Sequence, residues 1–246
     1  MTALVAALGR RSRRDGARGL ITYYDLGSGA RTELSGRTFA NWVDKTYHLL
    51  VELDVQPGDE VALPLARTHP GHWVTFALTA GAWQAGAVVV PRMSEDAVVT
   101  AVGPQDVAIA AGGVILACSL HPLGFGFTEP LPAGVIDFSI EVRSQPDAHA
   151  EEPVLESAPA WRDGTETLSH ADLAATPTVS ERVLVRPTSP LETLVAGYVA
   201  PLLGGGSAVV VSGDDDAALA RIAEQERVDW ALDATSRVPS GRAQPL

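Results

Sequence analysis

Lysine is almost absent from this chain of 246 residues, because seventeen of its eighteen basic residues are arginine and Lys45 is the only lysine. A reaction that depends on lysine ammonium groups therefore has a single residue to draw on. Cysteine is equally scarce, and Cys118 has no second cysteine with which to form an internal disulfide. The sequence contains no run of eighteen apolar residues, so it predicts no membrane span. From these absences we expect a cytoplasmic protein.

Positive charge is in the minority, since the formal net charge is -12. This balance argues against a nucleic-acid partner, because phosphates require a basic surface for affinity. Five arginines nevertheless lie between Arg10 and Arg18, with Asp15 as the single acid among them. The cluster is either a basic arm or the solvated end of a first helix, and its shortness favours the helix end. An apolar stretch precedes these arginines, whereas a secretory signal has the reverse order.

Hydrophobic periodicity predicts an α/β protein with a mainly parallel sheet. The clearest signal is an apolar run over residues 60–65, a slim alanine-rich helix over 73–85 and a second apolar run over 87–90. This order is typical of a βαβ unit, so we predict that the two strands are parallel neighbours. The other expected strands cover residues 20–25, 31–34, 107–110, 115–118, 182–186, 208–211 and 228–232, and the other expected helices cover residues 4–14, 38–53 (N-cap Thr38), 191–203 and 217–225 (N-cap Asp214).

Prolines and acidic residues interrupt the pattern between residues 141 and 166. We interpret this segment as an acidic surface connection. The sequence thus predicts a single α/β domain over residues 1–235, with sub-lobes 1–140 and 167–235 on either side of the connection. The tail 236–246, rich in Pro, Gly, Arg and Ser, is expected to be flexible.

Two parts of the chain carry a family likeness. The first contains the segments TFANWVDKTYHLLVEL, VQPGDEVAL and ALTAGAWQAGAVVVP, and the second contains VAGYVAPLLGGGSAVVV. In this order and spacing they resemble the N-terminal subdomain of the AMP-binding, or adenylate-forming, superfamily, which includes acyl-CoA synthetases. A short stand-alone group of proteins from GC-rich bacteria is similar at this level. The resemblance implies a layered α/β fold with mainly parallel sheets flanked by helices.

The sequence departs from that family at the phosphate loop. In the family this loop is a run of Ser, Thr and Gly ending in Pro-Lys-Gly, and it precedes a Thr/Ser-His pair. Here Ser169-His170 matches the pair, but the preceding residues 161–168 contain one glycine flanked by Asp163 and Glu166, and they lack the lysine. Such loops bind phosphate through backbone N–H groups that need the conformational freedom of glycine. We therefore expect no catalytic residue, and the degenerate loop does not support ATP or AMP as a cofactor.

The resemblance also implies later nucleotide and magnesium motifs, and a C-terminal domain with a second lysine, that this sequence does not contain. Lys45 is expected to lie inside a structural helix, so it does not replace that lysine. The predicted function is a non-catalytic, truncated homologue that serves as a binding or partner module. Its partner is an unknown protein, a second copy of the chain or a small molecule. The alternatives are a component of an adenylate-forming ligase completed by another chain, and an enzyme with unrelated chemistry.

Three polar segments are candidate ligand-binding sites. Thr68, His69 and His72 follow a predicted strand and begin a helix, where an anion could bind, although capping and loop packing are the favoured explanation. The two histidines have metal-ligand spacing, but no third ligand is suggested, so no metal is expected. Thr188 and Ser189 follow another predicted strand and also suit an N-cap. Ser169 and His170 complete the set, and a hydrolase interpretation of His170 with Ser189 lacks a G-x-S-x-G motif.

Overall fold

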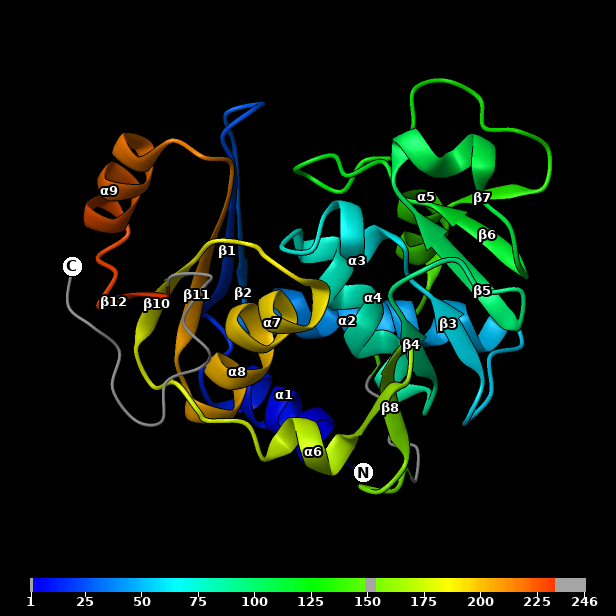
Figure 1. Cartoon of the computed structure of the whole chain (residues 1–246), viewed down its shortest axis with the longest axis horizontal. Helices are drawn as coiled ribbons and strands as arrows, with labels where there is room; N and C mark the ends of the chain where they lie inside the picture. The colour runs from blue at the N-terminus through cyan, green and yellow to red at the C-terminus, as the bar shows by residue number, and fades with distance from the viewer. Residues whose placement is uncertain (1, 149–153, 233–246) are drawn as a thin grey trace.

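Two β-sheets, with helices between and around them, form the part of the chain that the computed structural model describes, residues 2–148 and 154–232 (Figure 1). The five-stranded sheet has the strand order β12-β10-β11-β1-β2, and the seven-stranded sheet has the order β7-β6-β5-β3-β4-β8-β9. The strands are β1 (Gly19–Asp25), β2 (Ala30–Ser35), β3 (Glu60–Ala62), β4 (Val88–Val90), β5 (Ala97–Val102), β6 (Val114–Ala117), β7 (Val135–Asp137), β8 (Pro159–Asp163), β9 (Glu166–Ser169), β10 (Arg182–Val185), β11 (Ser207–Ser212) and β12 (Trp230–Leu232).

The helices are of three kinds. The α-helices are α1 (Ala3–Arg14), α2 (Gly36–Glu52), α3 (Leu65–Thr68), α4 (Trp73–Gln84), α5 (Phe138–Ser144), α6 (His170–Ala174), α7 (Pro190–Leu194), α8 (Ala200–Gly204) and α9 (Asp216–Gln225). A 3₁₀ helix covers Pro104–Ile109, and a π-helical turn, Val195–Val199, joins α7 to α8. No helix of the described residues is both long enough and apolar enough to cross a bilayer.

Parallel pairing dominates both sheets, which confirms the predicted α/β class. Only the hairpins β1–β2 and β8–β9 are antiparallel among the strand pairs of the described residues. The predicted βαβ unit is also confirmed, because β3 and β4 are parallel neighbours with Val61 opposite Val89, and α4 connects them. Every residue of α4 is buried, since the helix lies between α2 and the seven-stranded sheet. Gly81 permits the close approach of α2, because a Cβ there would lie 2.6 Å from Cγ2 of Thr46.

The five-stranded sheet combines strands from the early and the late parts of the described chain. Its β1 pairs in parallel with β11, so Tyr23 lies opposite Val210. Alternate residues of β11 face opposite sides, as a strand requires. Val210 points into the main core, whereas Val209 and Val211 pack with apolar residues of α9 in a smaller cluster. This sheet therefore combines strands from residues 1–140 with strands from residues 167–235, and the expected division into sub-lobes stays a prediction.

Several predicted boundaries were wrong for identifiable reasons. The strand expected over residues 60–65 ends at Ala62, because Pro64 fixes a helical backbone and α3 follows. The strand expected over residues 107–110 is part of a 3₁₀ helix, and Ile109 is 71 % exposed there. A short apolar run does not distinguish the two structures. Strand β5, Ala97–Val102, was not predicted.

Two helix caps also differ from the prediction. Ser35, not Thr38, caps α2, and its side chain accepts a hydrogen bond from the N–H of Thr38. Asp215, not Asp214, caps α9 in the same way. Neighbouring Ser, Thr and Asp residues are all good caps, so the sequence does not select between them. The segment 141–166 is not irregular throughout, because β8 lies inside it, and the tail 236–246 lies outside the described residues.

Candidate functional site

The carboxyl ends of strands from both sheets meet at one place, which we call the strand-end edge (residues 67–72, residues 187–189 and Asp25). Gly71 is the point of closest approach, because a Cβ on it would lie 2.7 Å from Cγ of Pro187 and 2.5 Å from Cγ1 of Val210. The edge therefore brings together two of the three polar segments that the sequence predicted as sites. In α/β sheets ligands bind at such strand ends.

His72 is a packed capping residue at this edge. It is 3 % exposed, and its Nδ1 accepts a hydrogen bond of 3.2 Å from the N–H of Val74 at the start of α4. Its ring lies edge-on to Tyr23, with the centroids 4.7 Å apart. Burial, together with the neighbouring His69, lowers the pKa of His72 to about 3. The imidazole is therefore neutral, and its Nδ1 is already occupied by the hydrogen bond that caps α4.

His69 and Thr68 form a more open polar pair. His69 is partly buried, and its Nδ1 lies 3.0 Å from Oγ1 of Thr68 and 3.5 Å from Nε2 of Gln105. Burial lowers the pKa of His69, although the charges of Asp106 and Asp25 oppose this shift. Gln105 and Asp106 were missed by sequence reasoning, because their segment was expected to lead into a strand rather than a 3₁₀ helix. No sequence signal connects them to His69, which is separated from Gln105 by 36 positions.

Thr188 and Ser189 occupy capping positions. Ser189 is the N-cap of α7, and the hydroxyls of Ser189 and Thr188 both donate to Oε2 of Glu192, at 2.9 and 3.1 Å. The backbone N–H of Thr188 donates to Oγ1 of Thr193. These hydroxyls are thus satisfied within their own turn. Ligand binding by them stays a prediction.

Ser169 and His170 lie away from the strand-end edge, at the opposite end of the β8–β9 hairpin. Ser169 caps α6 in a reciprocal capping box with Asp172. His170 is fully buried beside Trp83, with ring centroids 6.0 Å apart, and neither of its ring nitrogens has a hydrogen-bond partner in the described part of the chain. Burial lowers its pKa to about 4. The structure therefore does not bring His170 and Ser189 together as a catalytic pair.

The stretch matched to the phosphate loop is a tight β-hairpin. Asp163 on β8 pairs with Glu166 on β9, so Gly164 and Thr165 alone make the turn, with Gly164 in the left-handed region at φ 61°. Residues 164–167 are exposed, but Trp161 is buried. Arg67 donates to both carboxylate oxygens of Asp163, at 2.7 and 2.8 Å. This ion pair places the hairpin turn at the strand-end edge.

Lys45 has a structural position, as predicted. It lies in α2, and its ammonium group donates to the carbonyl oxygens of Arg143, at 3.2 Å, and Gln145 at the end of α5. Within residues 2–148 and 154–232, no three His, Cys, Asp or Glu side chains are grouped so that they could hold a metal ion.

Comparison with known proteins places this geometry in context. No family model matches the chain. A protein of Mycobacterium tuberculosis (strain ATCC 25618 / H37Rv), described as a TIGR03089 family protein, is 35 % identical over 235 residues, which cover 86 % of this chain and 90 % of that protein.

Solved structures with a similar fold include acyl-CoA synthetases. The Brucella canis acyl-CoA synthetase has a TM-score of 0.75 at 15 % identity, over 94 % of this chain and 47 % of that enzyme. The N-terminal domain of FACL13 from Mycobacterium tuberculosis has a TM-score of 0.66 at 16 % identity, over 94 % of this chain and 62 % of that domain. The chain thus has the fold of the N-terminal part of adenylate-forming enzymes and spans about half the length of the Brucella enzyme.

Proposed function

This chain belongs to the TIGR03089 family, and on that premise we propose that it is a non-catalytic homologue of the N-terminal part of acyl-CoA synthetases that acts as a binding or partner module. The observation that carries the proposal is the two-residue turn of the β8–β9 hairpin. It stands where the resemblance to adenylate-forming enzymes puts their phosphate loop.

The shape of this turn argues against a triphosphate site. A phosphate loop surrounds its ligand with several backbone N–H groups, which requires a longer glycine-rich segment. Here the backbone reverses at Gly164 and Thr165, and the ladder resumes at once between Asp163 and Glu166.

The charges around the turn point the same way. Asp163 and Glu166 both flank it with carboxylates, which repel a triphosphate. The guanidinium of Arg67 contacts this turn, but it already donates to both oxygens of Asp163. A nucleotide would therefore have to displace this ion pair before it could use the guanidinium.

The strand-end edge contains no lysine that could take part in adenylation. The single lysine, Lys45, donates to the carbonyls of Arg143 and Gln145, so it holds α5 against α2. Transfer of an adenylyl group relies on positive charge positioned at the reacting phosphate. Lys45 would have to leave its helix contacts to supply that charge.

A second candidate is a component of an adenylate-forming ligase in which another chain supplies the phosphate loop and the lysine. It is favoured by the match of 94 % of this chain to 47 % of the Brucella canis acyl-CoA synthetase. In this case the strand-end edge, with Thr68 and His69, would contribute to a shared ligand site.

ATP separates the two candidates. Urea unfolding would be measured with magnesium and ATP, and with magnesium chloride at the same ionic strength as the control. A site in this chain that is filled at a hundredfold excess over its Kd would add about 2.7 kcal/mol to the free energy of unfolding. We expect no such gain. Saturable stabilisation by ATP at the strand-end edge would favour the ligase component instead.

A further inference from the structure

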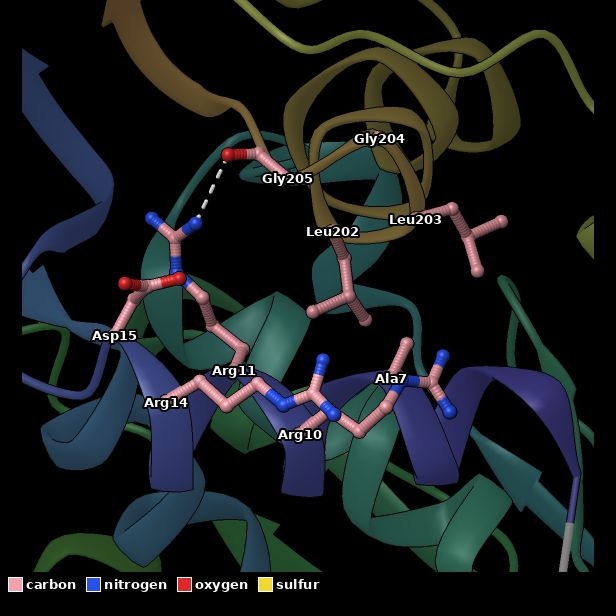
Figure 2. Close-up of a pocket in the computed structure, with 9 residues that line it drawn as sticks. All are labelled: Ala7, Arg10, Arg11, Arg14, Asp15, Leu202, Leu203, Gly204 and Gly205. Carbon is pink, nitrogen blue, oxygen red and sulfur yellow. Dashed lines mark hydrogen bonds between the residues drawn. The ribbon is translucent and has the colours of Figure 1, made fainter.

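A groove of about 220 Å³ lies between α1 and the C-terminal end of α8, away from the strand-end edge (Figure 2). We call it the basic groove. Its α1 side consists mainly of Arg10, Arg11, Arg14 and Asp15, and its α8 side includes Leu202 and Gly205. Because Arg11 contacts the carbonyl of Gly19 at the start of β1, the groove lies at the amino ends of the strands of the five-stranded sheet.

The amphipathic pattern of α1 creates the basic side. Leu4 and Leu8 bury one face of the helix in the core, and its last turn carries the arginines. The groove holds three guanidinium groups against the single carboxylate of Asp15. This local excess of positive charge stands out in a chain of net charge -12.

Arg11 is fixed in the wall of this groove. It is 7 % exposed, and its Nη1 and Nη2 donate to the carbonyl oxygens of Gly205 and Gly19, both at 3.0 Å. Its Nε has no hydrogen-bond partner in the described part of the chain. Burial and the neighbouring Arg18 lower the pKa of Arg11, although Asp15 opposes this. A buried guanidinium is ordinarily paired with a carboxylate, but within the described part of the chain the hydrogen bonds of Arg11 go to neutral carbonyls.

Arg10 and Arg14 are exposed and available. Both project from the side of α1 that faces the end of α8 (Figure 2). Among residues 2–148 and 154–232, neither side chain has a carboxylate or carbonyl partner. Two exposed guanidinium groups thus lie beside a buried one, and the planar guanidinium matches the oxygens of phosphate well.

From this arrangement we infer that the basic groove binds a small phosphate-bearing anion, either inorganic phosphate or a phosphate monoester. The volume sets the size, because it lies below the roughly 300–1,000 Å³ of pockets for drug-sized ligands. The side chain of Leu202 offers an apolar contact to the organic part of an ester. The net negative charge disfavours a polyanionic surface, because the remainder of the protein would repel it, whereas a small anion meets only the groove.

Matched arginine variants test this inference. Thermal unfolding would be followed while inorganic phosphate replaces chloride at constant ionic strength, and again with glycerol 3-phosphate. The test variant is Arg10→Gln with Arg14→Gln. The control is Arg13→Gln, which removes one positive charge from the same helix, where the test variant removes two, and which does not line the groove. We expect saturable stabilisation of the unaltered protein and of the control, and a Kd larger by at least about tenfold in the test variant.

The outcomes separate the sources of the anion. Saturation by inorganic phosphate alone supports a free-phosphate site, and tighter binding of glycerol 3-phosphate supports an ester site. The inference is overturned if neither anion saturates, or if Arg13→Gln weakens binding as much as the test variant does. It is also overturned if only phosphatidylserine vesicles bind, because that indicates a lipid surface.

The same variants keep this inference distinct from the proposed function. If ATP stabilises the unaltered protein but not the test variant, ATP binds at the basic groove. Stabilisation by ATP that survives in the test variant counts against the non-catalytic proposal and leaves the groove unaffected.

Discussion

Glu226 connects the first hairpin of the chain to its last described strands, and its removal should cost a large part of the stability of the five-stranded sheet. Its carboxylate accepts hydrogen bonds from Tyr24 and Arg31 of the β1–β2 hairpin and from Arg182 of β10. The side chain is only 8 % exposed. The three donors therefore satisfy a carboxylate that water scarcely reaches.

The size of the effect follows from the pKa of this carboxylate. Burial alone would raise the pKa of Glu226, but the hydrogen bonds from Arg31 and its other partners lower it from 4.5 to about 2. A shift of that size corresponds to roughly 3 kcal/mol of stability. Removing one partner of a buried ion pair generally costs roughly 3–5 kcal/mol, which is similar to this value. We therefore expect Glu226→Gln to lose about 3 kcal/mol at neutral pH.

The sign of the shift fixes the pH dependence. A carboxylate with a lowered pKa stabilises the fold above its unfolded pKa of 4.5, and this contribution is lost as the pH falls towards 2. Urea unfolding of the unaltered protein and Glu226→Gln would be compared from neutral pH down to about pH 3, where the difference should be about half as large. Glu33→Gln is the control, because Glu33 also pairs with Arg31 but is 41 % exposed, and it should cost at most about 1 kcal/mol. A difference that stays constant with pH would refute the reasoning.

Two further substitutions test the packing around the candidate sites. Gly71→Ala should destabilise the protein by about 1–3 kcal/mol, because its Cβ would overlap Val210 and Pro187, and urea unfolding that shows no loss would contradict the described contact between the sheets. Ser169→Ala should cost about 1 kcal/mol, because it removes the cap of α6, whereas Thr167→Ala on the exposed strand β9 should be nearly neutral. Equal losses in these two variants, measured by thermal unfolding, would show that Ser169 does not act through its cap.

The sequence predicted the elements whose signals are local. The βαβ unit from β3 to β4 was found because two apolar runs flank a helix of small residues, and parallel pairing then follows from the crossover. The helices α1 and α2 have clear apolar faces. Part of the 3₁₀ helix at Pro104–Ile109 was mistaken for a strand, since an apolar run of four residues is too short to show a period.

The arrangement of the strands into two sheets required contacts that are distant in the sequence. Strand β8 was missed inside a proline-rich acidic segment, although it pairs with β4 about 70 positions earlier. The pairing of β1 with β11 spans an even longer separation. No propensity argument selects such partners, because pairing depends on the completed core.

The same limit applies to the sites. The arginines of α1 were visible as a cluster, and the end of a solvated helix was a reasonable interpretation of them. The groove exists only because Gly205, 194 positions from Arg11, completes it. Likewise, the two segments of the strand-end edge were each predicted, but their contact at Gly71 was not.

Exchange of pyrophosphate into ATP tests the central claim most directly, because it reports adenylation without requiring a later step. The isolated chain would be assayed at high concentration with magnesium and a panel of fatty, aryl and amino acids, beside a Lys45→Ala variant. We expect no carboxylate-dependent exchange above background, since the β8–β9 turn offers no phosphate loop and Lys45 is held by α5. Exchange that is lost in Lys45→Ala would show that this lysine reaches the nucleotide. Exchange that survives in the variant would reveal an arginine-based mechanism, and either result would contradict the proposal that the protein is non-catalytic.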